Sequence, residues 1–173
     1  GAVPPACKVY EARQAIAVGA AELDLVINIG AARSGHFDVV RREIEDIVTL
    51  AKVTGLTEHG EEILVKVILE TGFTSCVEQE RICRIAEEVR ADFVKTCTGF
   101  GPRGVTVEDV RFLRHITSRD VGIKASGGIR TYEQALALIN AGASRLGTSC
   151  GPAILEGYER VEQPIAEEVL ETE

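Results

Sequence analysis

The chain has 173 residues, of which 45% are hydrophobic and 27% charged, with 17 Gly and 5 Pro. This length and composition suit one domain with an apolar core, and they exclude collagen, low-complexity and disordered sequence. The formal net charge is −8 and no basic run is present, which argues against a nucleic-acid partner. No apolar run approaches the roughly 18–20 residues of a membrane span, so no membrane partner is expected.

The cysteines and histidines give no sign of a metal site. The five cysteines are an odd number without a CxxC pair, and the three histidines are scattered. We therefore expect neither a zinc site nor a disulfide framework, and a cytoplasmic, reducing location is favoured. Because the sequence contains no methionine, we also expect that it is trimmed, processed or part of a longer chain.

In chain order, the pattern predicts a helix followed by five pairs of strand and helix. The first helix covers residues 7–18 and is closed by Gly19. The predicted strands are 22–29, 63–70, 91–97, 121–126 and 144–148, and the helices after them are 37–53, 75–89, 106–117, 131–141 and 151–160. Capping boxes at Ser75 and Thr106 open two of these helices. Residues 55–64 are predicted to form a polar surface loop, and about 164–173 an acidic tail.

Five strands that are each followed by a helix imply parallel pairing with right-handed crossovers. No proline- or glycine-rich linker divides the chain, so residues 1–173 are interpreted as one domain. A doubly wound sheet and a (β/α)8 barrel both remain open on this pattern. Eight units need about 250 residues, so the sheet is predicted to be either open or an incomplete barrel.

Three of the five lysines, Lys66, Lys95 and Lys124, interrupt apolar strand runs. Strands of a parallel sheet are usually covered on both faces, and a buried ammonium group is costly unless it is paired. For any single lysine, the alternative is a strand end that faces solvent or pairs with an acid. Lys66 is expected to pair with Glu70 or Asp24. Three lysines together with Asp24 in the same kind of position favour a functional cluster.

Crowded lysines have a chemical use. A neighbouring cation and partial desolvation favour a neutral amine, which can attack a carbonyl group and form a Schiff base. Lys95, Lys124 and Asp24 would supply a nucleophile, a second cation and an acid/base carboxylate. This chemistry requires no metal and no organic cofactor.

Glycine-rich turns follow the last three predicted strands. They are Thr98-Gly99, Ser126-Gly127-Gly128-Ile129-Arg130 and Gly147-Thr148-Ser149-Cys150-Gly151. The carboxyl ends of parallel strands are where such folds bind ligands, and small residues let backbone N–H groups approach an anion. One such loop alone is as easily ordinary turn chemistry. Three of them beside two strand lysines predict a site for a small anionic carbonyl compound.

At these residues the sequence resembles the DeoC type of deoxyribose-phosphate aldolase, a family of class I aldolases. The matching segments are ELDLVINIGAARSG, VKVILETG, ADFVKTCTGFGPRG, VGIKASGGIRT and GASRLGTSCG, spread from about residue 7 to residue 155. The resemblance implies a TIM (β/α)8-type barrel, with strands 4 to 8 present in this chain. The chain is then expected to begin at the loop after the third strand and to lack the first three strands.

The resemblance also implies roles for individual residues. Lys95 matches the Schiff-base lysine, Lys124 the second lysine that lowers its pKa, and Asp24 the carboxylate that works with a bound water. The positions that match the lining of the phosphate pocket are Gly99, Gly127, Gly128, Gly147 and Ser149, with Arg130 close by. The implied reaction is the reversible cleavage of 2-deoxy-D-ribose 5-phosphate to glyceraldehyde 3-phosphate and acetaldehyde.

The sequence departs from the family pattern in two respects, and two alternative functions remain open. Cys97 and Cys150 stand where many relatives have Ser, and Phe100 stands where some have Lys. Missing strands would leave both sheet edges unpaired, so we expect a homo-oligomer. The first alternative is a catalytically inactive barrel fragment that needs a partner or a second copy to fold. The second is another phosphate-binding barrel enzyme, such as an isomerase or a different class I aldolase.

Overall fold

The computed structural model describes residues 1–57, 60 and 62–162. Its strands are β1 (Glu22–Val26), β2 (Leu64–Ile68), β3 (Phe93–Lys95), β4 (Gly122–Ser126) and β5 (Arg145–Gly147). Its helices are α1 (Pro5–Ala17), α2 (Ile29–Arg33), α3 (Phe37–Thr54), α4 (Cys76–Glu88), α5 (Val107–Ile116), α6 (Tyr132–Asn140) and α7 (Gly151–Glu162). Over these ranges, no helix combines the length and the apolar character needed to cross a membrane.

The predicted strands and helices are all present, with one difference after the first strand. The sequence predicts a strand to residue 29, but β1 ends at Val26 and the short helix α2 follows. The reason is local, because the Asn28 side chain accepts a hydrogen bond from the Ala31 N–H at 3.0 Å and caps that helix. The chain therefore turns away from the sheet two residues after β1.

Three helices begin with capping boxes. The two predicted boxes, at Ser75 and Thr106, are confirmed, since each side chain accepts from the third helical N–H and the returning carboxylate accepts from the cap N–H. A third box at Thr131 opens α6 and uses Gln134 instead of an acid. These capping boxes fix the residues at which the loops after β2, β3 and β4 end and the helices α4, α5 and α6 begin.

Two predicted surface segments are described only in part or not at all. In the segment 55–64, Leu56 and Glu62 pair in an isolated antiparallel bridge, while residues 58, 59 and 61 lie outside the described residues. The predicted acidic tail, 164–173, also lies outside them.

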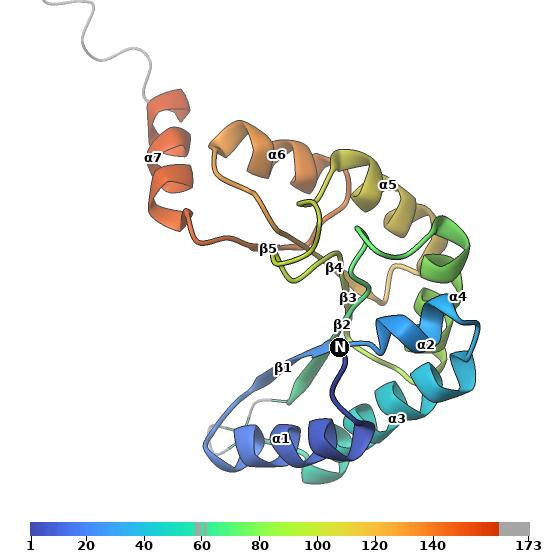
Figure 1. Cartoon of the computed structure of the whole chain (residues 1–173). Helices are drawn as coiled ribbons and strands as arrows, with labels where there is room; N and C mark the ends of the chain where they lie inside the picture. The colour runs from blue at the N-terminus through green and yellow to red at the C-terminus, as the bar shows by residue number, and fades with distance from the viewer. Residues whose placement is uncertain (58–59, 61, 163–173) are drawn as a thin grey trace, which may run out of the picture.

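The sheet is parallel throughout, with the strand order β1-β2-β3-β4-β5. A doubly wound sheet reverses its strand order at a switch point, and here the described strands follow one another without reversal. The doubly wound alternative is therefore excluded, and the α/β class with a parallel sheet is confirmed. In Figure 1 the helices form an arc on one side of the curved sheet, and no described helix covers its other side.

The two faces of the sheet differ because side chains alternate along each strand. The face toward the helices is apolar and carries buried side chains such as Leu25, Val67, Val94 and Ile123. The strand positions that alternate with these point to the opposite face, and they include Asp24 on β1, Lys66 on β2 and Lys95 on β3. On this opposite face β2 is buried, whereas β1, β3 and β4 carry exposed or half-buried residues. A strand with only one face in the core can carry lysines on the other without burying them in apolar surroundings.

The apolar face predicts where the stability resides. Ile123 lies in the middle of β4 and is fully buried, whereas Val53 on α3 is 80% exposed. Truncation of Ile123 to Ala leaves a cavity and should cost about 2–4 kcal/mol of unfolding free energy. The control Val53→Ala should change it by less than about 0.5 kcal/mol. Urea unfolding followed by circular dichroism measures both, and equal losses would contradict this assignment of the core.

Candidate active site

The strand register brings the predicted catalytic residues to one face of the sheet. Asp24 on β1 is the direct neighbour of Lys66 on β2, and Lys95 on β3 is the direct neighbour of Lys124 on β4. The side-chain alternation turns all four toward the face without helices. We call Asp24, Lys66, Lys95 and Lys124 the lysine cluster.

One carboxylate organises the lysine cluster. The Lys95 ammonium group lies 2.6 Å from Asp24 Oδ2, and the Lys124 ammonium group lies 2.8 Å from the same oxygen. The Lys66 ammonium group lies 3.0 Å from the other oxygen, Oδ1. The side chains of Lys95 and Lys124 are 11% and 16% exposed. Both amines are therefore held in place and close together, yet each has some access to solvent.

Lys66 has two carboxylate partners, one of the two that were predicted and one that was not. The sequence suggested Glu70 or Asp24, but the Lys66 ammonium pairs with Asp24 and with Glu22 Oε2, the latter at 2.7 Å. Glu22 also pairs with Arg145 on β5. The Glu22–Arg145 bridge links the first and last described strands across the open face. Lys66 itself is almost fully buried and is paired with two carboxylates.

The pKa of Asp24 reflects two opposing effects. Partial burial removes water from the carboxylate and raises its pKa, but the hydrogen bonds from Lys124, Lys95 and Lys66 together outweigh this and hold the pKa well below its usual range. Asp24 is therefore an anion at neutral pH. It serves as the common acceptor for three ammonium groups.

A cavity of about 440 Å³ opens beside Lys95 and Lys124 at the carboxyl ends of the strands. It is lined by residues of the three glycine-rich turns, which the structure brings together: Gly99, Gly127, Gly128, Arg130, Gly147 and Ser149 all border it, with Thr98, Phe100 and Thr148. Every predicted phosphate-lining residue thus lies around one cavity with both lysines. We call it the strand-end cavity.

Two of these glycines have a conformation that other residues rarely adopt. Gly127 and Gly128 have φ values of 99° and 77°. A Cβ on Gly127 would also lie 2.5 Å from the Cys97 sulfur. The turn after β4 therefore requires glycine, and its bare backbone faces the strand-end cavity.

The sequence-based reasoning missed Glu22 and Arg145, which complete the charge network. Glu22 lies two residues before Asp24 on β1, and Arg145 lies two residues before Gly147 on β5. The two-residue period of a strand could therefore have indicated that both face the lysine cluster. Their pairing itself has no local signal, because they are 123 residues apart in the chain.

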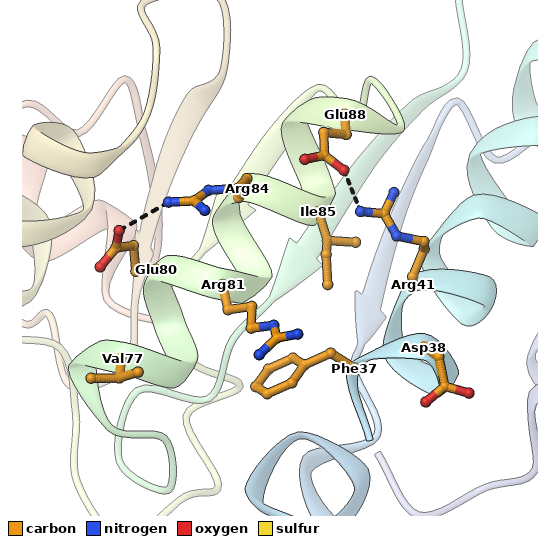
Figure 2. A pocket seen from close by; sticks show the side chains of 9 residues that line it. All are labelled: Phe37, Asp38, Arg41, Val77, Glu80, Arg81, Arg84, Ile85 and Glu88. Carbon is orange, nitrogen blue, oxygen red and sulfur yellow. Dashed lines mark hydrogen bonds and ion pairs between the residues drawn. The ribbon is translucent and has the colours of Figure 1, made fainter. Parts of the chain in front are cut away.

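A larger groove of about 610 Å³ lies elsewhere, between α3 and α4 on the helical side. Figure 2 shows that its arginines are engaged: Arg41 pairs with Glu88, Arg84 with Glu80, and Arg81 lies over the Phe37 ring. The three carboxylates and three arginines of its lining balance in charge, so nothing in it selects an anion. We place the candidate chemistry in the strand-end cavity. Among the described residues, no group of three His, Cys, Asp or Glu could hold a metal ion.

Fold and site together define a class. A parallel α/β sheet with sequential strand order, covered by helices on one side and carrying adjacent lysines at a carboxylate on the other, is the architecture of a TIM-barrel-like Schiff-base aldolase. The model of the DeoC/LacD family of aldolases matches residues 2–157. The chain belongs to this family, so the predicted family and enzyme class, an aldehyde-lyase, are confirmed.

Individual relatives agree. A protein named deoxyribose-phosphate aldolase from Thermococcus gammatolerans is 52% identical over 94% of this chain and 69% of its own length. A solved structure described as "QR15, an Aldolase" has a TM-score of 0.85 at 37% identity, covering 96% of this chain and 71% of that one. A deoxyribose phosphate aldolase from Aeropyrum pernix, described as tetrameric, has a TM-score of 0.81 at 33% identity, covering 93% and 64%. The chain thus spans about two thirds of the length of these relatives.

The lowered pKa of Asp24 predicts a pH dependence of stability. A carboxyl group whose pKa is lower in the folded than in the unfolded state stabilises the fold above the unfolded value of about 4, and this contribution is lost as pH falls through the folded value. The urea stability of the parent should therefore fall between about pH 5 and pH 3, and Asp24→Asn should flatten that fall.

The matched control is Asp46→Asn, which removes an exposed carboxylate on the outer side of α3. This variant should keep the pH dependence of the parent. An Asp24→Asn protein with the same acid slope as the parent would show that the lysine cluster does not hold the charge of Asp24.

Proposed function

We propose that this chain is a class I aldolase that reversibly cleaves 2-deoxy-D-ribose 5-phosphate to glyceraldehyde 3-phosphate and acetaldehyde. The observation that carries the proposal is the pair Lys95 and Lys124, whose amines share one oxygen of Asp24 beside a cavity ringed by glycine turns. The names of the relatives support the choice of substrate.

In the proposed mechanism, Lys95 is the nucleophile. Its neutral amine attacks C1 of the open-chain sugar, and loss of water gives an iminium ion. Lys124 contacts the same Asp24 oxygen at 2.8 Å and acts as the positive neighbour of the nucleophile rather than as a nucleophile itself. This assigns the two lysines different tasks although they have a common partner.

Carbon–carbon cleavage then needs a base and an electron sink. The C3 hydroxyl gives its proton to Asp24 through a water, the C2–C3 bonding pair moves toward the iminium nitrogen, and glyceraldehyde 3-phosphate leaves. The remaining enamine takes a proton at C2 and becomes an iminium ion again. Water hydrolyses it to acetaldehyde and the free Lys95 amine. Asp24 is ionised and so can accept the proton, although the three lysines that lower its pKa also make it a weaker base.

The phosphate group is proposed to lie at the glycine end of the strand-end cavity. The backbone at Gly127 and Gly128, the Ser149 hydroxyl and the Arg130 guanidinium border this end and supply donors and positive charge. Gly99 and Gly147 complete the wall because they have no side chains to fill it.

We further propose that the five strands correspond to strands 4 to 8 of an eight-stranded TIM barrel, within one partial barrel domain over residues 1–173. Sequential strand order and the length relative to the relatives support this correspondence. The tetramer described for the Aeropyrum pernix relative supports a homo-oligomer, and five unpaired cysteines suit a cytoplasmic location. An isomerase is less favoured because isomerisation does not use a lysine pair at one carboxylate. The names of the relatives favour an active aldolase over an inactive fragment.

Removal of the Lys95 amine tests the proposed nucleophile. Lys95→Leu should lower acetaldehyde release from 2-deoxy-D-ribose 5-phosphate by about a thousandfold or more, because the amine proposed to form the Schiff base is gone. The matched control Lys52→Leu removes an exposed lysine of α3 whose ammonium group donates to the Arg90 carbonyl oxygen, and it should retain the parent rate. If a folded Lys95→Leu protein cleaves the sugar at the parent rate, the assigned nucleophile is wrong.

Inorganic phosphate tests the anion end of the cavity independently of catalysis. Phosphate at 100 times its dissociation constant should stabilise the parent by about 2.7 kcal/mol, seen as a rise in Tm. Arg130→Gln should weaken phosphate binding roughly tenfold through loss of a charged donor. Arg111→Gln, at an exposed position on α5, should leave it unchanged. Equal phosphate affinity in all three proteins would exclude Arg130 from the site.

A further inference from the structure

Glu70 stands just after β2 in a conformation that glutamate rarely adopts. Its φ is +52°, and the only other non-glycine residue of the described chain with a positive φ is Arg90. The Glu70 residue is 3% exposed, and its carbonyl oxygen accepts hydrogen bonds from the Phe73 N–H and the Thr74 hydroxyl. The left-handed backbone conformation of a non-glycine residue costs free energy. Its presence at a buried glutamate indicates a specific use for the side chain.

That side chain reaches the loop after the proposed nucleophile. Glu70 Oε2 accepts hydrogen bonds from the Thr98 hydroxyl at 2.6 Å and from the Thr98 N–H at 3.2 Å. The Thr98 hydroxyl oxygen in turn accepts from the Phe100 N–H at 3.0 Å. All three of these loop groups are therefore used in holding the turn at Gly99, and none of them is left to bind a ligand.

The loop is packed against Glu70 at close range. A Cβ on Gly101 would lie 2.6 Å from Glu70 Oε1, so only glycine allows the carboxylate this position. Further along, the Val105 N–H donates to the Gly127 carbonyl oxygen at 3.0 Å. Residues 98–105 thus form a fixed connection from Glu70, past the wall of the strand-end cavity, to the glycine turn after β4.

We propose that Glu70 is a positioning residue for the phosphate end of the cavity, and that it gives the enzyme its preference for phosphorylated over unphosphorylated substrates. Glu70 does not line the cavity, and it acts through Thr98. Its carboxylate fixes the Gly99 turn and, through the 98–105 loop, the turn at Gly127. The lysine cluster is held by Asp24, so chemistry at C1 is independent of Glu70. This inference rests on the proposed function for its choice of substrates.

Two variants separate the carboxylate from the backbone strain. Glu70→Gln keeps the size of the side chain but removes its charge, and Glu70→Gly removes the side chain and relieves the strain. The control Arg90→Gly relieves the same kind of strain at an exposed position at the end of α4, remote from the loop. The readouts are inorganic phosphate affinity by calorimetry, and kcat and KM for 2-deoxyribose 5-phosphate and for 2-deoxyribose.

We expect both Glu70 variants to lose phosphate affinity roughly tenfold, the equivalent of one charge-assisted hydrogen bond. KM for the phosphorylated sugar should rise by a similar factor, while kcat/KM for 2-deoxyribose stays within about twofold and Arg90→Gly matches the parent. Equal losses with both sugars would reduce Glu70 to general structural support. Unchanged phosphate affinity in the folded variants would overturn the proposal.

Thr98 supplies a second test if the Glu70 variants do not fold. Thr98→Val removes the hydroxyl donor to Glu70 and should produce the same selective loss for the phosphorylated sugar, and Thr98→Ser should restore it. A Thr98→Val protein with the parent's phosphate affinity would overturn the proposal. Should the parent cleave neither sugar, the proposed function fails, and the phosphate affinities still decide the role of Glu70.

Discussion

Three lysine ammonium groups converge on the Asp24 carboxylate at the open face of the sheet, and the other features of the site depend on this contact. Each lysine comes from a different strand, so the carboxylate also ties β1 to β2, β3 and β4. A single anion cannot neutralise three cations, and Glu22 supplies the second negative charge by pairing with Lys66. The excess positive charge therefore falls on Lys95 and Lys124, beside the cavity.

The fold keeps the free-energy cost of this arrangement low because the two faces of the sheet carry different kinds of residue. Apolar residues of alternate strand positions pack under the helices and form the core, while the other positions carry charge. The strands end at one edge, so the lysines and the glycine turns meet there without long insertions. The groups proposed to bind phosphate and the Lys95 amine border one cavity, as the proposed contact with the two ends of one small substrate requires.

The sequence predicted the strands, most helices and every residue of the lysine cluster, because lysines inside apolar runs and glycines after them are local signals. It did not predict α2, whose cap lies in the Asn28 side chain. Of the two partners predicted for Lys66, Asp24 is confirmed, whereas the left-handed backbone at Glu70 directs that side chain to Thr98. The Glu22–Arg145 pair could not be predicted, since contacts between distant strands follow from register and curvature.

The central claim is that Lys95, and neither Lys66 nor Lys124, is the reactive amine of the cluster that Asp24 holds together. Borohydride reduction in the presence of acetaldehyde, followed by peptide mass spectrometry, tests it directly on the folded chain. We predict a reduced two-carbon adduct confined to Lys95, with Lys66 unmodified because it is buried and paired with two carboxylates. An adduct spread over all three lysines, or found on Lys124 alone, would contradict the account.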